Sequence, residues 1–248
     1  MSSGSVVPQE VADDVFRVDG GLVNWYLLRD GRDLTLVDAG YPGDAGAVLA
    51  SIAVLGHRPG DVRALLLTHA HADHIGAATA LAVHGVPVWC SPEEVPHARR
   101  EFLQQVTPGM LLPHLWRPSV LGWALGAVTH GGLRSVAVPA LPFPAPGPLD
   151  LPGAPVPVAT PGHTVGHTAY LLPGAGAVLT GDTLVTGHPT VRRVGPQLLP
   201  EFFDHDRAGA VRALGALAAL DADLLLPGHG RPLRTPVTRA VELAADAA

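Results

Sequence analysis

The feature that most constrains this chain is the HAHADH segment at residues 69–74, where six consecutive residues offer four metal-ligating side chains. It follows, after Thr68, a mainly apolar run at residues 62–67 that we expect to be a buried strand. Neutral imidazole and carboxylate groups suit zinc, iron or manganese. Ionisable groups packed this densely repel one another when protonated, and they are costly to bury without a ligand. The segment therefore predicts a metal site at the end of a strand.

The spacing within the segment indicates how the ligands divide. Side chains alternate along an extended chain, so His69, His71 and Asp73 are expected on one side. His74 breaks this alternation and requires a turn. We therefore expect the His69/His71 pair on one metal and the Asp73/His74 pair on a second.

Composition and charge restrict the class of protein. The 248 residues suffice for one large domain, and a chain that is 47% hydrophobic and 15% charged is typical of a globular fold. The net charge of −6, without a basic run, argues against a nucleic-acid partner. The single cysteine, Cys90, excludes an internal disulfide and a multi-cysteine zinc site, and we expect it to be a small buried hydrophobe.

The expected location is the cytoplasm. Residues 1–10 contain neither the basic nor the apolar part of a secretory signal. The longest strongly apolar stretch, residues 120–128, is too short to cross a bilayer. The sequence leaves the oligomeric state open.

Strands and helices alternate along most of the chain, which predicts an α/β layered core in a single domain, residues 1–248. The expected strands are at residues 15–18, 22–28, 34–37, 62–67, 86–90, 156–159, 168–172, 177–180 and 223–226. The expected helices are at residues 44–55, 75–84, 93–105, 206–220 and 235–247. Each half contains strands followed by a helix, which indicates a pseudo-symmetric sandwich.

Residues 92–145 interrupt this alternation and are rich in glycine, proline and large apolar residues. We interpret them as a partly helical insertion. Two roles stay open for it: packing against the core, and forming a lid or apolar wall over the metals.

Three later residues share the context of the first segment. His163, Asp182 and His229 each follow an expected strand and lie in a glycine-rich turn. Glycine allows the backbone to approach closely and to direct a side chain toward the strand ends. Together with residues 69–74, these residues complete a set of seven ligands.

In the order and type of these residues, nearly the whole chain resembles the metallo-β-lactamase fold superfamily of dinuclear metallohydrolases. The resemblance implies a four-layered αβ/βα sandwich with two metal ions, zinc first and iron or manganese as alternatives, at the edge between its sheets. It implies a ligand set for each metal and one bridging carboxylate: His69, His71 and His163; Asp73, His74 and His229; and Asp182.

Further residues are expected around this centre. A metal-bound imidazole donates its other N–H to an acceptor, and Asp38, at the end of a strand, is the best candidate for that role. His167 is a second candidate, with a structural role equally open. Candidates for the substrate pocket, of which we expect only some to line it, are Met110, Trp116, Trp123, Phe202 and Phe203.

Two adjacent cations lower the pKa of a shared water, so the implied chemistry is attack of a metal-bridging hydroxide on a carbonyl, with Asp73 orienting the nucleophile and moving its proton. Asp182 argues against antibiotic hydrolysis, because β-lactamases of this superfamily lack a bridging carboxylate. The PGHTVGHT and TGDTL segments resemble the glyoxalase II and lactonase branches, although the chain ends one helix after His229, without the helical domain by which glyoxalase II binds glutathione. We therefore expect a hydrolase of thioesters, lactones or esters with an apolar acyl part.

Other functions stay open. Phosphodiester hydrolysis requires a cationic channel, which an acidic, lysine-free chain offers poorly. A β-lactamase-type amidase and an iron-dependent sulfur dioxygenase or other redox enzyme use the same fold. A non-catalytic, metal-stabilised module is disfavoured, because structural zinc sites close with four ligands. Besides a small-molecule substrate, an acyl carrier protein is a candidate partner, docking at Arg99–Arg100 or Arg192–Arg193.

Overall fold

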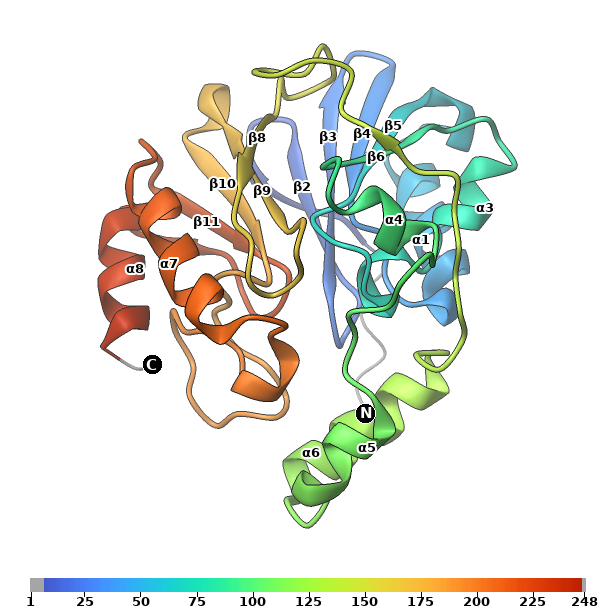
Figure 1. Cartoon of the computed structure of the whole chain (residues 1–248). Coiled ribbons are helices and arrows are strands. Elements are labelled where there is room, and N and C mark those ends of the chain that lie inside the picture. The colour runs from blue at the N-terminus through green and yellow to red at the C-terminus, as the bar shows by residue number, and fades with distance from the viewer. Residues whose placement is uncertain (1–6, 247–248) are drawn as a thin grey trace.

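The computed structural model describes residues 7–246, in which two β-sheets face each other (Figure 1). The first sheet has seven strands in chain order: β1 (Gln9–Ala12), β2 (Val15–Asp19), β3 (Asn24–Asp30), β4 (Asp33–Val37), β5 (Val62–Leu66), β6 (Val88–Cys90) and β7 (Leu141–Pro142). The second has five, in the order β12 (Leu233–Arg234), β11 (Leu224–Pro227), β10 (Ala177–Gly181), β9 (Thr168–Leu172) and β8 (Val156–Ala159).

Helices cover the outer face of each sheet (Figure 1). The α-helices are α1 (Ala45–Val54), α2 (Ala72–Ile75), α3 (Ala78–Ala82), α4 (Val95–Ala98), α5 (Pro108–Leu111), α6 (Pro118–Thr129), α7 (Arg207–Ala218) and α8 (Val237–Ala245). The 3-10 helices are η1 (Pro42–Asp44), η2 (Pro59–Asp61), η3 (Leu112–His114), η4 (Pro173–Ala175) and η5 (Glu201–Phe203).

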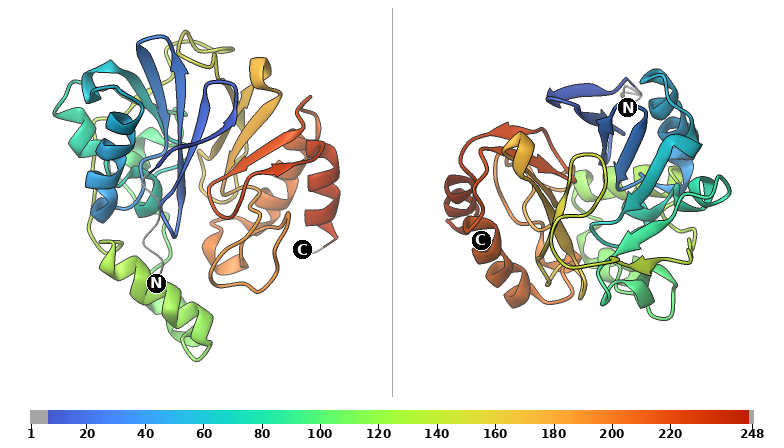
Figure 2. Two further views of the ribbon diagram at one scale, coloured as in Figure 1. Left: turned by 180° about the vertical axis from the view of Figure 1, so that it is seen from behind. Right: turned by 90° about the horizontal axis from the view of Figure 1, so that it is seen from above.

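Three apolar layers hold the sandwich together. The inner layer packs Leu28 and Leu66 of the first sheet against Leu179 and other residues of the second. A second layer joins the first sheet to α1 and α3, and a third joins the second sheet to α7 and α8. This arrangement confirms the expected four-layered αβ/βα sandwich, and the view from above in Figure 2 shows the two sheets side by side.

The pairing of the strands determines where the loops meet. Strand β4 runs parallel to β5, and β10 runs parallel to β11. Because the carboxyl ends of parallel neighbours lie at one edge of a sheet, the loops after β4 and β5 are adjacent, and so are those after β10 and β11. These loops contain Asp38, the 69–74 segment, Asp182 and His229.

Two expected helices differ from the structure. The helix expected at residues 93–105 is wrong beyond α4, because the chain turns at Arg100, which has a left-handed φ of 61°. The helix expected at residues 75–84 is divided into α2 and α3 around Gly76. A side chain at Gly76 would lie 2.0 Å from the backbone of Tyr41, so the chain is pressed against a neighbouring loop there.

The short strands β1, β7 and β12 were not expected. The expectation about a signal segment concerns residues 1–10, of which residues 1–6 lie outside the described part. Among the described residues, every helix is too short or too polar to cross a bilayer.

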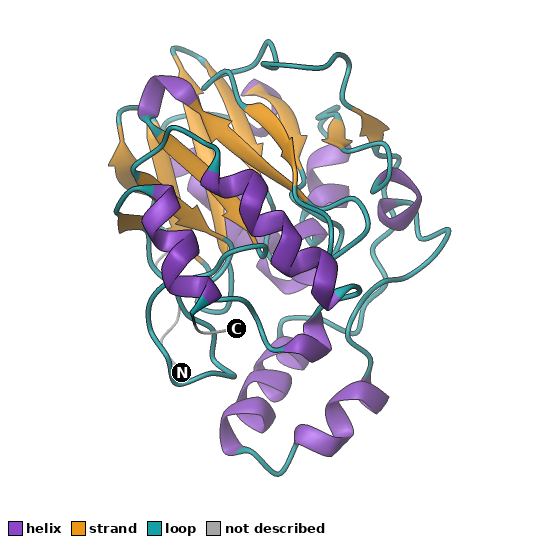
Figure 3. Ribbon diagram, turned by 60° about the vertical axis from the view of Figure 1, so that its left-hand side comes forward, coloured by secondary structure: helices purple, strands orange, loops and turns teal. Residues whose placement is uncertain are grey.

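The segment at residues 92–145 contains α4, α5, α6 and β7. Helices α5 and α6 form a hairpin that projects from one end of the sandwich (Figures 1 and 3). The inner side of α6 is anchored by Trp123, which packs in a cluster with Val185, Leu199 and Phe203. The interpretation of this segment as an insertion stays a prediction.

Candidate metal centre

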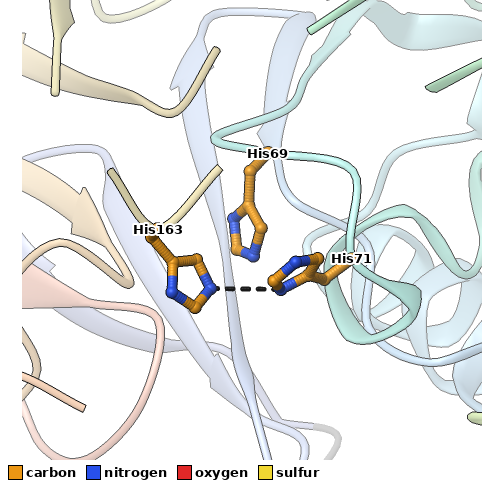
Figure 4. Close-up of side chains that lie close together, drawn as sticks. All are labelled: His69, His71 and His163. Atoms are coloured by element: carbon orange, nitrogen blue, oxygen red, sulfur yellow. Dashed lines mark hydrogen bonds between the residues drawn. The ribbon is translucent and has the colours of Figure 1, made fainter. Parts of the chain in front are cut away.

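The seven predicted ligands come from four segments of the chain at one edge of the sandwich. His69 and His71 follow β5, and Asp73 and His74 lie on the adjoining α2, because the chain turns into that helix right after His71. His163 lies between β8 and β9, Asp182 directly follows β10, and His229 follows β11. Figure 4 shows His69, His71 and His163 converging from two separate loops.

The structure brings all seven side chains together. Their ligand atoms form three groups, each within 4.8 Å: His69, His71 and His163; His69, His74 and Asp182; Asp73, His74 and His229. Asp182 lies centrally, with Oδ2 3.5 Å from His163 Nε2 and 3.2 Å from His229 Nε2. A carboxylate that faces both ends of the cluster is placed as a bridging ligand would be.

Unpaired atoms in this cluster fit a metal. His69 Nε2, His74 Nε2 and Asp182 Oδ1 are buried, and none has a hydrogen-bond partner among the described residues. A buried polar atom without a partner costs about 1–3 kcal/mol. Five imidazoles and two carboxylates are a donor set suited to zinc, iron or manganese. His74 Nε2 and Asp182 Oδ1 face each other at 3.4 Å without forming a hydrogen bond. The residues therefore fit one or two divalent ions, which these three atoms would help to hold.

The outer nitrogens of the imidazoles on the Asp38 side are held by hydrogen bonds. His74 Nδ1 donates to Asp38 Oδ2 at 2.8 Å. His69 Nδ1 lies 3.0 Å from the hydroxyl of Thr68, which itself donates to Asp38 Oδ2 at 2.8 Å. Asp38 has a left-handed φ of 60°, which a non-glycine residue adopts only where the surroundings enforce it. One carboxylate thus contacts one candidate ligand directly and a second through Thr68.

The other three imidazoles use acceptors that the sequence did not indicate. His71 Nε2 donates to the carbonyl of Gln104. His229 Nδ1 donates to the carbonyl of Leu22 at 2.7 Å, and His163 Nδ1 donates to Asp204 Oδ1 at 3.1 Å. Two of these acceptors are backbone carbonyls, which carry no residue signature, and Asp204 lies in a loop 41 positions after His163.

His167 supports the site through the backbone of a candidate ligand rather than through an imidazole. Its Nε2 accepts the backbone N–H of Asp182 at 3.1 Å, while Nδ1 faces the hydroxyls of Thr160 and Thr183 at 2.8 and 2.9 Å. Burial lowers the pKa of His167 well below its usual value, so the ring is neutral and Nε2 can accept. His167 therefore fixes the turn that carries Asp182.

The charges of the cluster favour a bound cation. Burial and neighbouring imidazoles hold the pKa values of His69 and His71 well below the usual value. Burial would also lower the pKa of His229, but Asp182 and Asp73 raise it to about 10. Asp182 itself is buried, yet His229 and His74 hold its pKa well below the usual value. The carboxylates therefore stay ionised, and their negative charge attracts a cation, which can be a protonated imidazole or a metal ion.

A cavity of about 250 Å³ opens onto the cluster. Asp73, Asp182, His163 and His229 form its polar end, and Tyr41 and His188 also face it. The rest of its wall is mainly apolar and includes Val106, Leu111, Leu115, Trp123, Leu199 and Phe203.

Two of the five predicted pocket residues, Trp123 and Phe203, line this cavity. Met110 and Trp116 do not, and these residues are 44% and 80% exposed. Phe202 is also absent from the wall, and its ring stacks on that of His114 with 4.6 Å between the ring centroids. Size and apolar character alone therefore did not distinguish the residues that line the cavity from those that do not.

Known proteins resemble this chain along most of its length. The probable metallo-hydrolase YflN of Bacillus subtilis is 27% identical over 235 residues, covering 90% of this chain and 86% of that protein. A hydroxyacylglutathione hydrolase of Anaeromyxobacter dehalogenans is 35% identical over 207 residues, covering 82% of this chain and 60% of that protein. A solved metallo-beta-lactamase family protein of Thermus thermophilus is 27% identical with a TM-score of 0.62, covering 91% of this chain and 74% of that one.

The family described as the metallo-beta-lactamase superfamily matches residues 18–229, from the second strand to the last candidate ligand. This range contains the HAHADH segment and all three later ligand residues. The family match of the sequence and the observed αβ/βα sandwich agree, and the chain belongs to the metallo-beta-lactamase superfamily of metal-dependent hydrolases.

Proposed function

We propose that this chain is a dinuclear metal-dependent hydrolase, with zinc as the first candidate metal, of thioesters, lactones or esters that have an apolar acyl part. The observation that carries this proposal is the mainly apolar cavity of about 250 Å³ that ends on the ligand cluster. Of the described residues that line it, none is lysine or arginine, which disfavours a phosphodiester substrate. The similarity to a protein named hydroxyacylglutathione hydrolase supports an acyl substrate.

The residues of the ligand cluster divide the work of hydrolysis. His69, His71 and His163 would hold one ion, Asp73, His74 and His229 the other, and Asp182 would bridge them. When bound, such ions lower the pKa of water and polarise a carbonyl. Burial would raise the pKa of Asp73, but His74 and His229 hold it well below its usual range, so this carboxylate is ionised. The ionised carboxylate can accept a hydrogen bond from the attacking water and orient it, and the proton would pass along this bond toward the leaving group.

Tyr41 adds a hydrogen-bond donor to the same end of the cavity. Burial and the charges of Asp73 and Asp182 raise the pKa of its phenol well above the usual value. The hydroxyl therefore stays protonated at neutral pH and can donate to the carbonyl or the leaving group of a substrate. This residue was not among those predicted from the sequence.

The first test removes single candidate ligands. In His69→Ala and Asp73→Ala, turnover should be abolished and bound metal should fall below the wild-type stoichiometry. His84→Ala and Asp13→Ala are matched controls, because both residues are exposed and lie outside the cluster. Unchanged activity in either ligand variant would sink the assignment.

The second test identifies the substrate and the metal. Aryl esters, acyl thioesters, lactones, β-lactams and phosphodiesters are assayed while metal content is measured. We expect thioesters or lactones with apolar acyl groups to have the highest kcat/KM. Highest activity on phosphodiesters or β-lactams would overturn the proposed substrate class. Bound iron with oxygen-dependent turnover would favour the redox alternative.

An acyl carrier protein stays a proposed partner, and the contacts of the four arginines single out Arg192. Arg99 and Arg100 donate to the backbone carbonyls of Ala140 and Ala70, and Arg193 donates to that of Leu243 at 3.0 Å, so these three guanidinium groups are engaged within the chain. Arg192 is exposed and makes no side-chain hydrogen bond or ion pair with the described residues. Arg192→Glu should raise KM for carrier-bound substrate alone, and an equal effect on free thioesters would count against docking.

A further inference from the structure

Glu94 is a buried carboxylate outside the ligand set, just before α4. Its Oε1 accepts hydrogen bonds from the backbone N–H of Ala70 at 2.8 Å and from His97 Nδ1 at 2.7 Å. Its Oε2 accepts from Thr164 Oγ1 at 2.8 Å and from the backbone N–H of Gly166 at 3.0 Å. The carboxylate therefore accepts four hydrogen bonds, which compensate for its burial.

Three of these partners belong to the loops that carry the first metal's candidate ligands. Ala70 lies between His69 and His71, and Thr164 directly follows His163. Arg100 donates to the carbonyl of Ala70 at 2.8 Å, so both backbone polar groups of Ala70 are fixed by the segment around α4. One side chain thus joins two loops that are far apart in the sequence.

A second connection runs from Glu94 to the same loops through His97 and Gln104. His97 donates from Nδ1 to Glu94, and its Nε2 accepts the backbone N–H of Gln104 at 3.3 Å. The carbonyl of Gln104 accepts from His71 Nε2, and its side-chain Oε1 accepts the backbone N–H of Val165 at 2.8 Å. Gln104 therefore contacts both loops, one at a ligand imidazole and the other two residues after His163.

The loop after His163 is packed directly onto Glu94. A side chain at Gly166 would place Cβ 2.3 Å from the backbone nitrogen of Glu94 and 2.6 Å from Ser91 Oγ. Glycine is required at this position by the closeness of the two backbones. The contact leaves the loop little freedom to move relative to Glu94.

We propose that Glu94 is a positioning residue that sets the geometry of the first metal site by holding the His69–His71 loop and the His163 loop together. This inference rests on the metal centre of the proposed function. Glu94 does not line the cavity, so it acts through the ligands. A residue that pre-orients three ligands raises the affinity for the ion that they share.

The test compares Glu94→Gln with Glu93→Gln. Both change a carboxylate into an amide at adjacent positions, but Glu93 is exposed. The amide nitrogen of glutamine donates and cannot accept, so at least one backbone N–H of the two loops loses its partner. Zinc or cobalt affinity is measured by competition with a chelator, and the metal-free proteins are compared by thermal unfolding.

We expect Glu94→Gln to bind one ion per chain about 10- to 100-fold more weakly, with the second ion little affected and Glu93→Gln like wild type. Thr164→Val removes one of the four bonds and should cause a smaller loss of the same kind, which keeps the test decisive if Glu94→Gln folds poorly. Equal metal affinity in Glu94→Gln and Glu93→Gln would overturn the proposal. So would a loss shared by both ions that merely follows a lower Tm of the metal-free protein. If wild type binds no divalent ion, the metal centre of the proposed function fails as well.

Discussion

Asp204 illustrates how single side chains support this centre. It accepts from His163 Nδ1 and is held in turn by Arg207, whose Nη1 lies 2.9 Å from Asp204 Oδ2. Asp204→Asn preserves the shape but removes the charge that stabilises both contacts. We expect metal affinity to fall about 10-fold, measured by chelator competition, because outer partners of ligand histidines typically contribute this much. Glu201→Gln, an exposed change in the preceding 3-10 helix, should leave affinity unchanged, and an equal loss there would remove the role assigned to Asp204.

Cys90 offers a test of packing by chemical reactivity. Burial, with a further contribution from the charge of Glu94, raises the pKa of this thiol above its usual value. The reactive thiolate is therefore scarce at neutral and mildly alkaline pH. We expect a thiol reagent at pH 8 to leave the folded protein unlabelled and to label one thiol per chain in guanidinium chloride. Rapid labelling of the folded protein would show that Cys90 is accessible.

At this scale, the sequence predicts ligands better than their supports. The HAHADH segment concentrates its ligands in six residues, and His163, Asp182 and His229 each follow a strand within a glycine-rich turn. Asp204 and Glu94 act on residues 41 and 24 positions away along the chain, from loops without such a pattern. Their roles arise only when the loops are packed together, so no local signal identifies them.

At the scale of elements, Gly162 shows how closely α7 packs against the loop of His163. Gly162 has a φ of 139°, and a Cβ there would lie 2.0 Å from the backbone nitrogen of Ala210. Gly162→Ala should lower the free energy of unfolding by roughly 2 kcal/mol or more, because α7 or the loop must shift. The same change at Gly215, exposed in α7 with open space around it, should raise it by about 1 kcal/mol.

Urea unfolding of the two alanine variants measures this difference directly. Opposite signs are expected, although both changes add only one methyl group. If Gly162→Ala were as stable as wild type, α7 would not restrain the loop. Metal affinity should fall in Gly162→Ala alone, since only that glycine adjoins a candidate ligand.

Two tryptophans, one within helix α6 and one just before it, have different expected effects. Trp123 lines the cavity, and Trp116, just before the helix, is 80% exposed. Trp123→Ala should lower kcat/KM for substrates with apolar acyl groups about 10-fold or more, because the substrate loses an apolar contact worth about 1–3 kcal/mol. Trp116→Ala should have little effect on soluble substrates. Similar losses in both variants would place the acyl group outside the cavity.

The elements themselves were predictable where burial imposes a pattern. The strands around the inner layer were expected near their observed positions, because continuous apolar runs bounded by turns define them. Helix α4 was predicted too long, since no residue pattern in 99–105 indicates the left-handed turn at Arg100. The direction of the α5–α6 hairpin depends on contacts with Val185 and Leu199, which no local pattern contains.

At the scale of the whole molecule, the cluster joins the two halves of the sandwich. His69 to His74 come from the first half, while His163, Asp182 and His229 come from the second. An ion held by both halves binds only the folded chain, so it stabilises the fold by about 2.7 kcal/mol per site when its concentration is 100 times Kd. Dialysis against a chelator should therefore lower Tm, and added zinc should restore it. A Tm that changes under neither treatment would contradict metal binding by both halves of the sandwich.

The same cluster links metal binding to pH. In the metal-free protein, Asp182 and Asp73 raise the pKa of His229, against the effect of burial, to about 10 from an ordinary value of 6.5. A raised pKa in the folded state contributes stability below about pH 6.5 that is lost as the pH rises through about 10. A metal ion must displace that proton, so its affinity should increase between pH 7 and pH 9, by up to about 10-fold per pH unit for each proton released. Calorimetry in two buffers with different ionisation enthalpies counts the protons, and binding without proton release at pH 7 would show that His229 is already neutral.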